Sequence, residues 1–365
     1  MIPRLLLVPA ALAALGAAPV EVSSRNSGEV ASRDGANLQR PRWSPDGSQL
    51  SYEANFHEKK VVELFVGDPA TKAFSRVSAG GRAPSALTAG FQTAPTNAVC
   101  HELAWGPASA GGRFVYTAAT ETGDYDLFLS GAGALASTPG ADGGGAWSPD
   151  GRWIAFTSSR TGEGDLYLLD TAAMEQPPRR ISSAAGSSEV YAAWAPDSAG
   201  LAYVAHSRSG DNLWLKASLD ANPAQLTTWP GIQIRPRWAP SGKRIAFYAN
   251  HESPDRIDLY VVDGVAGATP KLLVKSVVPD LAGPSWTPDG LRLIVVRDAD
   301  DLLDPIASVD AATGATKDLA LDTVGHTDLD VVKRPDGKVW LAYVAQGRKS
   351  GSERDFQRLY TVTVD

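Results

Sequence analysis

The sequence predicts an all-β protein, a seven-bladed β-propeller whose blades are four-stranded antiparallel sheets. Three observations carry this prediction. A turn motif of the form Trp-Ser-Pro-Asp-Gly recurs along the chain, and short apolar runs follow each copy. From the second copy onward the copies lie about 46 residues apart, which is close to the length of one four-stranded blade. Six blades are the alternative count.

The turn motif has seven copies. Two are identical, Trp43 to Gly47 and Trp147 to Gly151. Proline presets φ at the first central position of such a turn, Asp tolerates the next position, and Gly takes the left-handed one. Each copy therefore predicts a tight hairpin between the strand that ends at the Trp and the strand that follows. The five variant copies begin at Trp105, Trp194, Trp238, Trp286 and Lys333.

The runs after each turn supply the other strands of a unit. In the third unit they are Trp153 to Phe156 and Asp165 to Asp170. Both are almost continuously apolar, as expected for sheets buried on both faces. An acid opens the third strand in several units, as Asp126, Asp165 and Asp258 do, and we expect these acids to close loops through hydrogen bonds or ion pairs. The single Trp of each unit is expected to pack as a wedge between blades.

The two termini are expected to share the last blade. The seventh unit supplies three strands and then the chain stops. Residues around Glu29 to Ser32 precede the first turn at the spacing of a fourth strand, so we expect them to complete that blade. Such closure leaves no exposed sheet edge in the ring. The predicted propeller domain therefore covers residues 27–365.

The first twenty residues have the pattern of a secretory signal peptide. Arg4 provides a positive charge, Leu5 to Leu15 is an apolar run, and small residues follow. The run is too short to span a bilayer, and no later segment is long enough for a transmembrane anchor. We expect a periplasmic or secreted protein with residues 1–20 removed. Because Cys100 is the only cysteine, no disulfide can form within the chain.

Composition narrows the class of ligand. Hydrophobic residues make up 43% and charged residues 21% of the chain, which is typical of a globular protein. The formal net charge is −7, and no domain-scale basic excess is present. This argues against nucleic acid as a partner.

The repeated unit, with Trp-Ser-Pro-Asp-Gly followed by an apolar strand and then Asp-Leu-Tyr, resembles the PD40 repeat of TolB-like propellers, which is a WD40-like repeat. The resemblance covers about residues 27–365. TolB itself carries an N-terminal α/β domain for which this sequence has no room, so the resemblance is to the repeat family and not to TolB. It implies a protein-binding role in the cell envelope.

Two further relatives of this repeat class imply other roles. Similar propellers gate serine peptidases of the prolyl-oligopeptidase type, but this sequence contains no Gly-x-Ser-x-Gly elbow. Oligogalacturonate lyases are seven-bladed propellers of similar repeats, and they bind a divalent metal through His and Gln.

Four arginines are the candidate ligand-binding residues. Arg40 and Arg42 enter the innermost strand of the first unit, and Arg235 and Arg237 enter that of the fifth. Residues of an innermost strand alternate between the core and the central channel. Arginines at the channel mouth suit an acidic peptide or an acidic sugar. Ion pairs with neighbouring blades are the alternative interpretation.

Three histidines are the candidate metal ligands. His57, His101 and His326 belong to neighbouring units once the ring closes, and strand alternation places them on one face. Neutral imidazole is a common ligand of transition metals. The alternative is that histidines of polar loops share a face by chance. No preformed spacing such as His-x-His supports the site, so we expect no cofactor, with a divalent metal as the alternative.

These observations favour an exported, monomeric, non-catalytic module that binds a protein or peptide of the cell envelope near the channel mouth. No catalytic residue is assigned. The long segment from Ser78 to Cys100 is the first candidate contact. The alternatives are a metal-dependent polysaccharide lyase of the oligogalacturonate type, using the histidine-bearing face, and an accessory propeller for a separate hydrolase.

Overall fold

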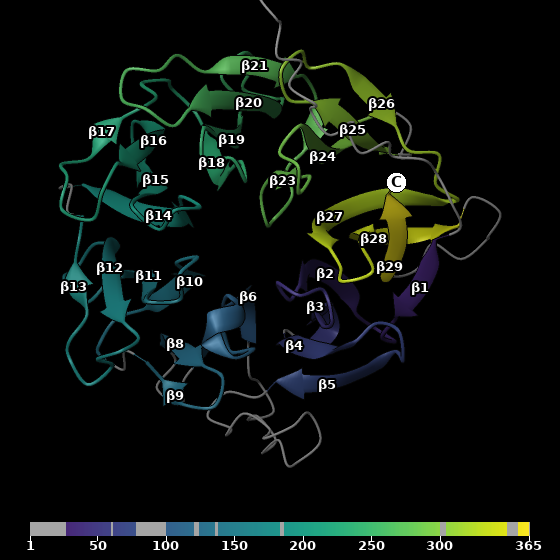
Figure 1. Ribbon diagram of the computed structural model, residues 1–365, viewed down its shortest axis with the longest axis horizontal. Coiled ribbons are helices and arrows are strands. Elements are labelled where there is room, and N and C mark those ends of the chain that lie inside the picture. The colour runs from purple at the N-terminus through teal and green to yellow at the C-terminus, as the bar shows by residue number, and fades with distance from the viewer. Residues whose placement is uncertain are drawn as a thin grey trace, which may run out of the picture.

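The computed structural model describes residues 27–59, 61–77, 100–119, 124–135, 138–182, 186–299, 304–348 and 357–364. Seven sheets surround a common axis (Figure 1), so the predicted count of seven blades is confirmed. Residues 1–20 and all of the predicted contact segment except Cys100 lie outside the described residues.

The first four blades follow the chain from the inside of the ring to the outside. Blade 1 has β2 (Asn37–Trp43), β3 (Leu50–Phe56), β4 (Val61–Asp68) and β5 (Ala73–Val77). Blade 2 has β6 (Cys100–Trp105), β7 (Phe114–Ala119), β8 (Tyr125–Leu129) and β9 (Gly133–Ala134). Blade 3 has β10 (Asp142–Trp147), β11 (Trp153–Ser158), β12 (Asp165–Asp170) and β13 (Arg179–Arg180). Blade 4 has β14 (Ser187–Trp194), β15 (Leu201–Ser207), β16 (Gly210–Lys216) and β17 (Ala224–Gln225).

The remaining blades complete the ring. Blade 5 has β18 (Gln233–Trp238), β19 (Arg244–Ala249), β20 (Asp258–Asp263) and β21 (Lys271–Val274). In blade 6 the inner strand is split into β22 (Val277–Val278) and β23 (Ser285–Trp286), which both pair with β24 (Arg292–Arg297), followed by β25 (Ile306–Asp310) and β26 (Thr316–Asp318). Blade 7 has β27 (Thr323–Lys333), β28 (Val339–Arg348), β29 (Arg358–Val364) and β1 (Gly28–Ala31). The described helices are the 3-10 turns η1 (His57–Lys59) and η2 (Ala108–Ala110).

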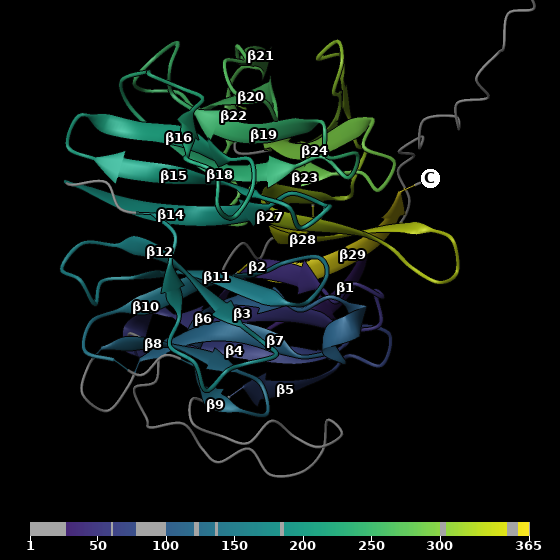
Figure 2. The ribbon, with the colours of Figure 1, turned by 60° about the vertical axis from the view of Figure 1, so that its left-hand side comes forward.

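The ring is closed by the N-terminal strand, as predicted. β1 pairs antiparallel with β29, with Gly28 opposite Thr361 (Figures 1 and 2). Val30 and Ala31 are buried in the same apolar cluster as Leu359. Burial of apolar area is the main favourable term in such a contact, so the termini are joined by packing as well as by the strand ladder.

The turn motif forms the expected hairpins. In blade 1 the Gly47 amide donates to the Ser44 carbonyl at 2.8 Å. The Asp46 carboxylate accepts from the Ser44 hydroxyl at 2.6 Å and from the Ser48 amide at 3.0 Å. Partial burial of Asp46 opposes ionisation, but these hydrogen bonds outweigh it and lower the pKa of Asp46.

The tryptophans join one blade to the next. In four blades the indole N–H of the motif Trp donates to a backbone carbonyl of the previous blade. The acceptor is the residue directly before the motif Trp of that previous blade. The pairs are Trp105 to Arg42 at 3.2 Å, and Trp194 to Ala146, Trp238 to Ala193 and Trp286 to Arg237, each at 3.0 Å. The predicted wedge therefore also carries a hydrogen bond.

The acids that open third strands have the structural role expected of them. Asp165 forms an ion pair with Arg180 at 2.8 Å, and Asp258 forms one with Arg256 at 2.6 Å. Both carboxylates are buried. In the described part of the chain, no helix is long and apolar enough to cross a membrane.

Candidate functional site

The innermost strands share an irregularity near the axis. The strand register shifts at a bulge in β2, β6, β10, β14, β18 and β27. At each bulge, and at the break between β22 and β23, one residue has positive φ. We call these seven residues the bulge ring: Arg40, Glu102, Gly144, Tyr191, Arg235, Gly283 and Asp328.

Five members of the bulge ring are not glycine. Positive φ is uncommon for such residues, and bulges and strained residues concentrate where a side chain must be aimed at a site. Arg40 has φ of 49° and Arg235 has φ of 56°. The recurrence of this conformation in blade after blade identifies the axial position as a candidate site.

Carboxylates connect the bulge ring on one side of the axis. The Arg40 amide donates to Asp328 at 3.1 Å, and the Glu102 amide donates to Glu53 at 2.7 Å. The Gly144 amide donates to Glu102 at 3.1 Å. In each case the acceptor belongs to the preceding blade. These contacts are charge-assisted, and they lock blades 7, 1, 2 and 3 together.

The two predicted arginines of blade 1 are both ion-paired. Arg40 Nη1 lies 3.2 Å from Glu53 Oε1, and Arg40 Nη2 lies 3.9 Å from Glu102 Oε1. Arg42 Nη1 lies 3.5 Å from Asp330 Oδ1. The interpretation as ion pairs with neighbouring blades therefore holds for Arg42, whose partner comes from blade 7, and for the Arg40 contact with Glu102.

The two predicted arginines of blade 5 have different surroundings. The Arg235 guanidinium lies over the Tyr191 ring, 4.1 Å from its centroid. Arg237 Nε donates to the Ala282 carbonyl at 2.8 Å. Neither arginine forms an ion pair with any residue that the structure describes.

The four arginines are close enough to influence one another. Burial lowers the pKa of Arg235, and the guanidinium groups of Arg40 and Arg42 also lower it. The Arg237 side chain is exposed to solvent. Desolvation by the surrounding protein lowers the pKa of Arg237 and Arg42 lowers it further, whereas Asp330 and Asp280 act in the opposite direction. The structure thus gathers Arg40, Arg42, Arg235 and Arg237 around the axis.

Two buried acids beside the arginines accept hydrogen bonds from backbone amides. Asp280 accepts from the amides of Ala282 and Leu329, each at 2.6 Å. Burial raises the pKa of Asp280, and the nearby Asp328 carboxylate raises it further. Asp328 accepts from the Leu281 amide at 3.0 Å as well as from Arg40. These acids fasten blade 6 to blades 7 and 1.

The predicted metal ligands have other partners where their side chains are described. His326 is buried, its Nε2 lies 2.9 Å from Thr323 Oγ1, and its Nδ1 lies 2.8 Å from the Asp304 carbonyl. His326 therefore has no ring nitrogen left for a metal. His57 Nε2 lies 3.3 Å from Asn37 Nδ2. The described residues include no group of three His, Cys, Asp or Glu side chains placed to hold a metal ion.

His101 is the second residue of β6, opposite Thr117, and its side chain is outside the described part. The convergence of the three histidines therefore stays a prediction.

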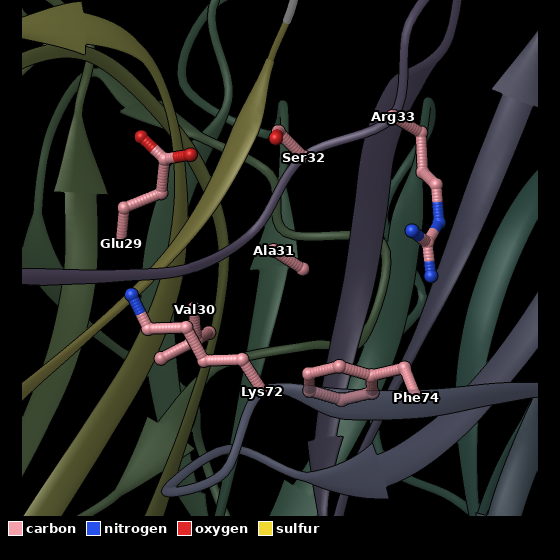
Figure 3. Close-up of a pocket in the computed structure, with 7 residues that line it drawn as sticks. All are labelled: Glu29, Val30, Ala31, Ser32, Arg33, Lys72 and Phe74. Atoms are coloured by element: carbon pink, nitrogen blue, oxygen red, sulfur yellow. The ribbon is translucent and has the colours of Figure 1, made fainter.

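A separate hollow of about 230 Å³ lies where the ring closes (Figure 3). β1 and the segment after it provide one wall, and the β4–β5 turn and β5 provide the other. Arg33 extends beside Phe74 in this view, and its guanidinium lies 4.5 Å from the centroid of the Phe65 ring. Glu29 is ion-paired with Arg358 of β29 at 3.3 Å. These contacts hold the closing strand in place. The lining residues are Glu29, Val30, Ala31, Ser32, Arg33, Lys72 and Phe74.

Sequence reasoning found the arginines but not their carboxylate partners. One sequence signal could have located the bulge positions, because each lies three residues before the motif Trp. These residues are Arg40, Glu102, Gly144, Tyr191, Arg235 and Gly283. Alignment of the repeats on their tryptophans brings these residues into one column. Glu53, Asp280 and Asp328 have no such repeat signal.

Solved structures with the same fold include proteins of different kinds. The oligogalacturonate lyase of Vibrio parahaemolyticus matches with a TM-score of 0.58 and 10% identity, covering 94% of this chain and 99% of that one. The Cps50 (Swd1) β-propeller domain of Myceliophteria thermophila matches with a TM-score of 0.56 and 12% identity, covering 93% and 99%. TolB from Acinetobacter baumannii matches with a TM-score of 0.44 and 15% identity, covering 91% and 80%.

No family model matches the sequence, and no curated protein matches it. The fold defines the class: the chain is a seven-bladed β-propeller, and its repeated unit resembles the WD40-like repeat of TolB-like propellers. At these identities the matches establish the fold and leave the activity open.

Proposed function

We propose that this propeller is a non-catalytic module that binds a protein or peptide partner at the axial arginine cluster. What supports the proposal is that Arg40 and Arg42 lie on the innermost strand β2 and Arg235 and Arg237 on the innermost strand β18, at the bulges of these strands. The blade 5 pair forms no ion pair with a described residue. Guanidinium groups recognise carboxylates with defined geometry, so such a cluster suits an acidic partner.

The acids of the axial cluster support binding rather than catalysis. A general acid or base must reach the reacting group and exchange a proton with it. Glu53, Asp280 and Asp328 are each at most 5% exposed, and each accepts hydrogen bonds from backbone amides. These hydrogen bonds join neighbouring blades.

Export is part of the proposal. The signal-like residues 1–20 direct the chain to the periplasm or the medium, where it acts as a monomer on a partner of the cell envelope. N-terminal sequencing of the protein recovered from the periplasmic fraction tests this step. A mature chain that begins between the apolar run and Ser27 supports it, and recovery of uncleaved protein from the cytoplasm contradicts it.

The binding role is tested by affinity capture from envelope extract, followed by mass spectrometry and titration of the purified partner. Three baits are compared: the unaltered protein, a variant lacking residues 79–98, and Arg235→Gln/Arg237→Gln. We expect one partner to be captured by the unaltered protein and lost with the arginine variant. Identical material from all three baits would contradict the proposal.

A further inference from the structure

In one half of the bulge ring, which we call filled, carboxylate side chains accept hydrogen bonds from backbone amides at the bulges. In the other half, which we call open, no described carboxylate does so. In blades 1, 2 and 3 a carboxylate of the preceding blade accepts from the amide of the bulge residue. In blade 7 the Asp280 carboxylate accepts from the amide of Leu329, next to the bulge residue. No carboxylate of the described residues accepts from the equivalent amides of Tyr191 in blade 4 and Arg235 in blade 5.

The sequence explains why these two blades differ. Asp328 and Glu102 are bulge residues, and each reaches forward to the next blade. The bulge residue before blade 4 is Gly144, and the one before blade 5 is Tyr191. Neither carries a carboxylate.

On one flank of this position, Gly144 leaves room for a side chain. A Cβ added at Gly144 would meet nothing within 4 Å. On the other flank, Gly283 packs its backbone against Arg235, because a Cβ there would come within 2.9 Å of the Arg235 carbonyl. The Tyr191–Arg235 pair thus lies between two positions that contribute no side chain, and it is only half-buried.

Two cations near this position form no ion pair with a described carboxylate, although Glu102 acts on Arg235, and Asp330 and Asp280 act on Arg237, at longer range. The Arg235 guanidinium lies over the Tyr191 ring, 4.1 Å from its centroid, and its N–H groups form no ion pair with a described carboxylate. Arg237 uses Nε for the Ala282 carbonyl, which leaves its terminal nitrogens available. Arg40 and Arg42, by contrast, are already ion-paired.

We propose that a carboxylate of the peptide partner occupies the open position at blades 4 and 5, where it accepts hydrogen bonds from the Tyr191 or Arg235 amide and from the guanidinium groups of Arg235 and Arg237. This inference rests on the proposed function and specifies it. The occupant in the filled blades is in every case an Asp or Glu side chain, so a peptide carboxylate is the group that this position fits. Arg40 and Arg42 hold the blades together.

A carboxylate built into the chain tests the geometry without any ligand. Gly144→Glu places an acid one blade before Tyr191, as Glu102 stands one blade before Gly144. Gly144→Gln is the matched control, because it has the same shape and the same backbone strain without the charge. We expect the Glu variant to melt at a higher temperature than the Gln variant, with the difference shrinking in high salt. Equal melting temperatures in low salt would overturn the inference.

A second test uses defined peptides in calorimetric titrations of the full protein. The probes are acetyl-Gly-Glu-Gly-amide, acetyl-Gly-Gln-Gly-amide and acetyl-Gly-Gly-Gly with a free C-terminus. Comparison of these probes shows whether the protein binds a side-chain carboxylate or a C-terminal carboxylate. We expect at least one carboxylate probe to bind, the amide probe to bind at least about tenfold more weakly, and Gly144→Glu to abolish binding.

Arg235→Gln should lower the affinity for the carboxylate probe at least about tenfold. Arg179→Gln, on the exposed outer strand β13, should leave that affinity unchanged. Binding that is indifferent to Arg235 would overturn this inference. The proposed function would survive that result if the captured partner still bound the axis. Galacturonic acid binding more tightly than every peptide probe would also overturn the inference, in favour of an acidic sugar.

Discussion

At the scale of single residues, the tryptophans differ in one measurable respect. Trp286 donates its indole N–H to the Arg237 carbonyl at 3.0 Å, whereas the buried Nε1 of Trp43 has no hydrogen-bond partner among the residues that the structure describes. Both side chains are less than 9% exposed, so their packing terms are similar. The two positions therefore separate wedge packing from the inter-blade hydrogen bond.

Trp286→Phe should lower the free energy of unfolding by ~1 kcal/mol more than Trp43→Phe, because only the first change removes a hydrogen bond and strands a carbonyl. Chemical denaturation of both variants measures the difference. Equal losses would mean that the indole N–H contributes nothing across the blade boundary.

Some features of the candidate site could be predicted from the sequence, and others could not. The arginines were predictable from their position in innermost strands, and their convergence follows from ring closure. The bulges were not predictable, because Arg40, Glu102 and Tyr191 have no intrinsic preference for the left-handed conformation that tertiary structure imposes. The metal site is the alternative interpretation of the histidines, and the ring of His326, one of its three candidate ligands, contacts Thr323 and the Asp304 carbonyl.

At the scale of elements, β1 is the strand on which the ring depends. It has only four residues, and it covers the outer edge of β29. Its position was predicted to within one residue, because the seventh repeat lacks a fourth strand. Val30 is 7% exposed and packs in the cluster that contains Leu359. An uncovered β29 would present unpaired backbone groups to other chains.

Val30→Asp should reduce the free energy of unfolding by ~2 kcal/mol or more, because it places a charge against that cluster. The variant should also form dimers or larger species through the exposed edge of β29. Denaturation and size-exclusion chromatography check these two effects. The control is Glu29→Gln on the same strand, which alters only the part-exposed ion pair with Arg358. A monomeric Val30→Asp protein with unchanged stability would refute the closure argument.

At the scale of the whole molecule, buried acids of two kinds shape the dependence of stability on pH. Burial opposes ionisation of Asp258, but hydrogen bonds from Arg256 and the Ser276 amide outweigh it and lower the pKa of Asp258. Its contribution is present above the ordinary carboxyl pKa and is lost as pH falls through the native value. Asp280 is the opposite case, because its raised pKa gives stability that is lost as pH rises.

Stability should therefore be greatest in mildly acidic solution and should decline on both sides. Asp258→Asn should flatten the acid limb, and Asp280→Asn should flatten the decline between about pH 4, near the ordinary carboxyl pKa, and about pH 8, near the native pKa of Asp280. Urea denaturation from about pH 2 to about pH 9 measures both limbs. An alkaline limb of unchanged slope in Asp280→Asn would show that Asp280 ionises as readily in the native state as in the unfolded one.

The whole ring also explains why the repeat motif identifies the fold and not the ligand. The turns of the Pro-Asp-Gly type and the tryptophans recur in most blades, whereas the bulge ring holds five residue types in its seven positions. Its filled half, from Asp328 to Gly144, is structural, and its open half contains Tyr191 and Arg235. The charges of the bulge ring thus separate its structural half from the half that we propose to bind the partner.

The most direct test of the account is the dissociation constant of the captured partner for the unaltered protein and for Arg235→Gln/Arg237→Gln, with Arg179→Gln as the control. The account predicts a loss of affinity of at least about tenfold in the double variant and no change in the control, because a charge-assisted hydrogen bond is worth about 1.5–3 kcal/mol. The same dissociation constant for all three proteins would contradict the assignment of the axial arginines as the binding site.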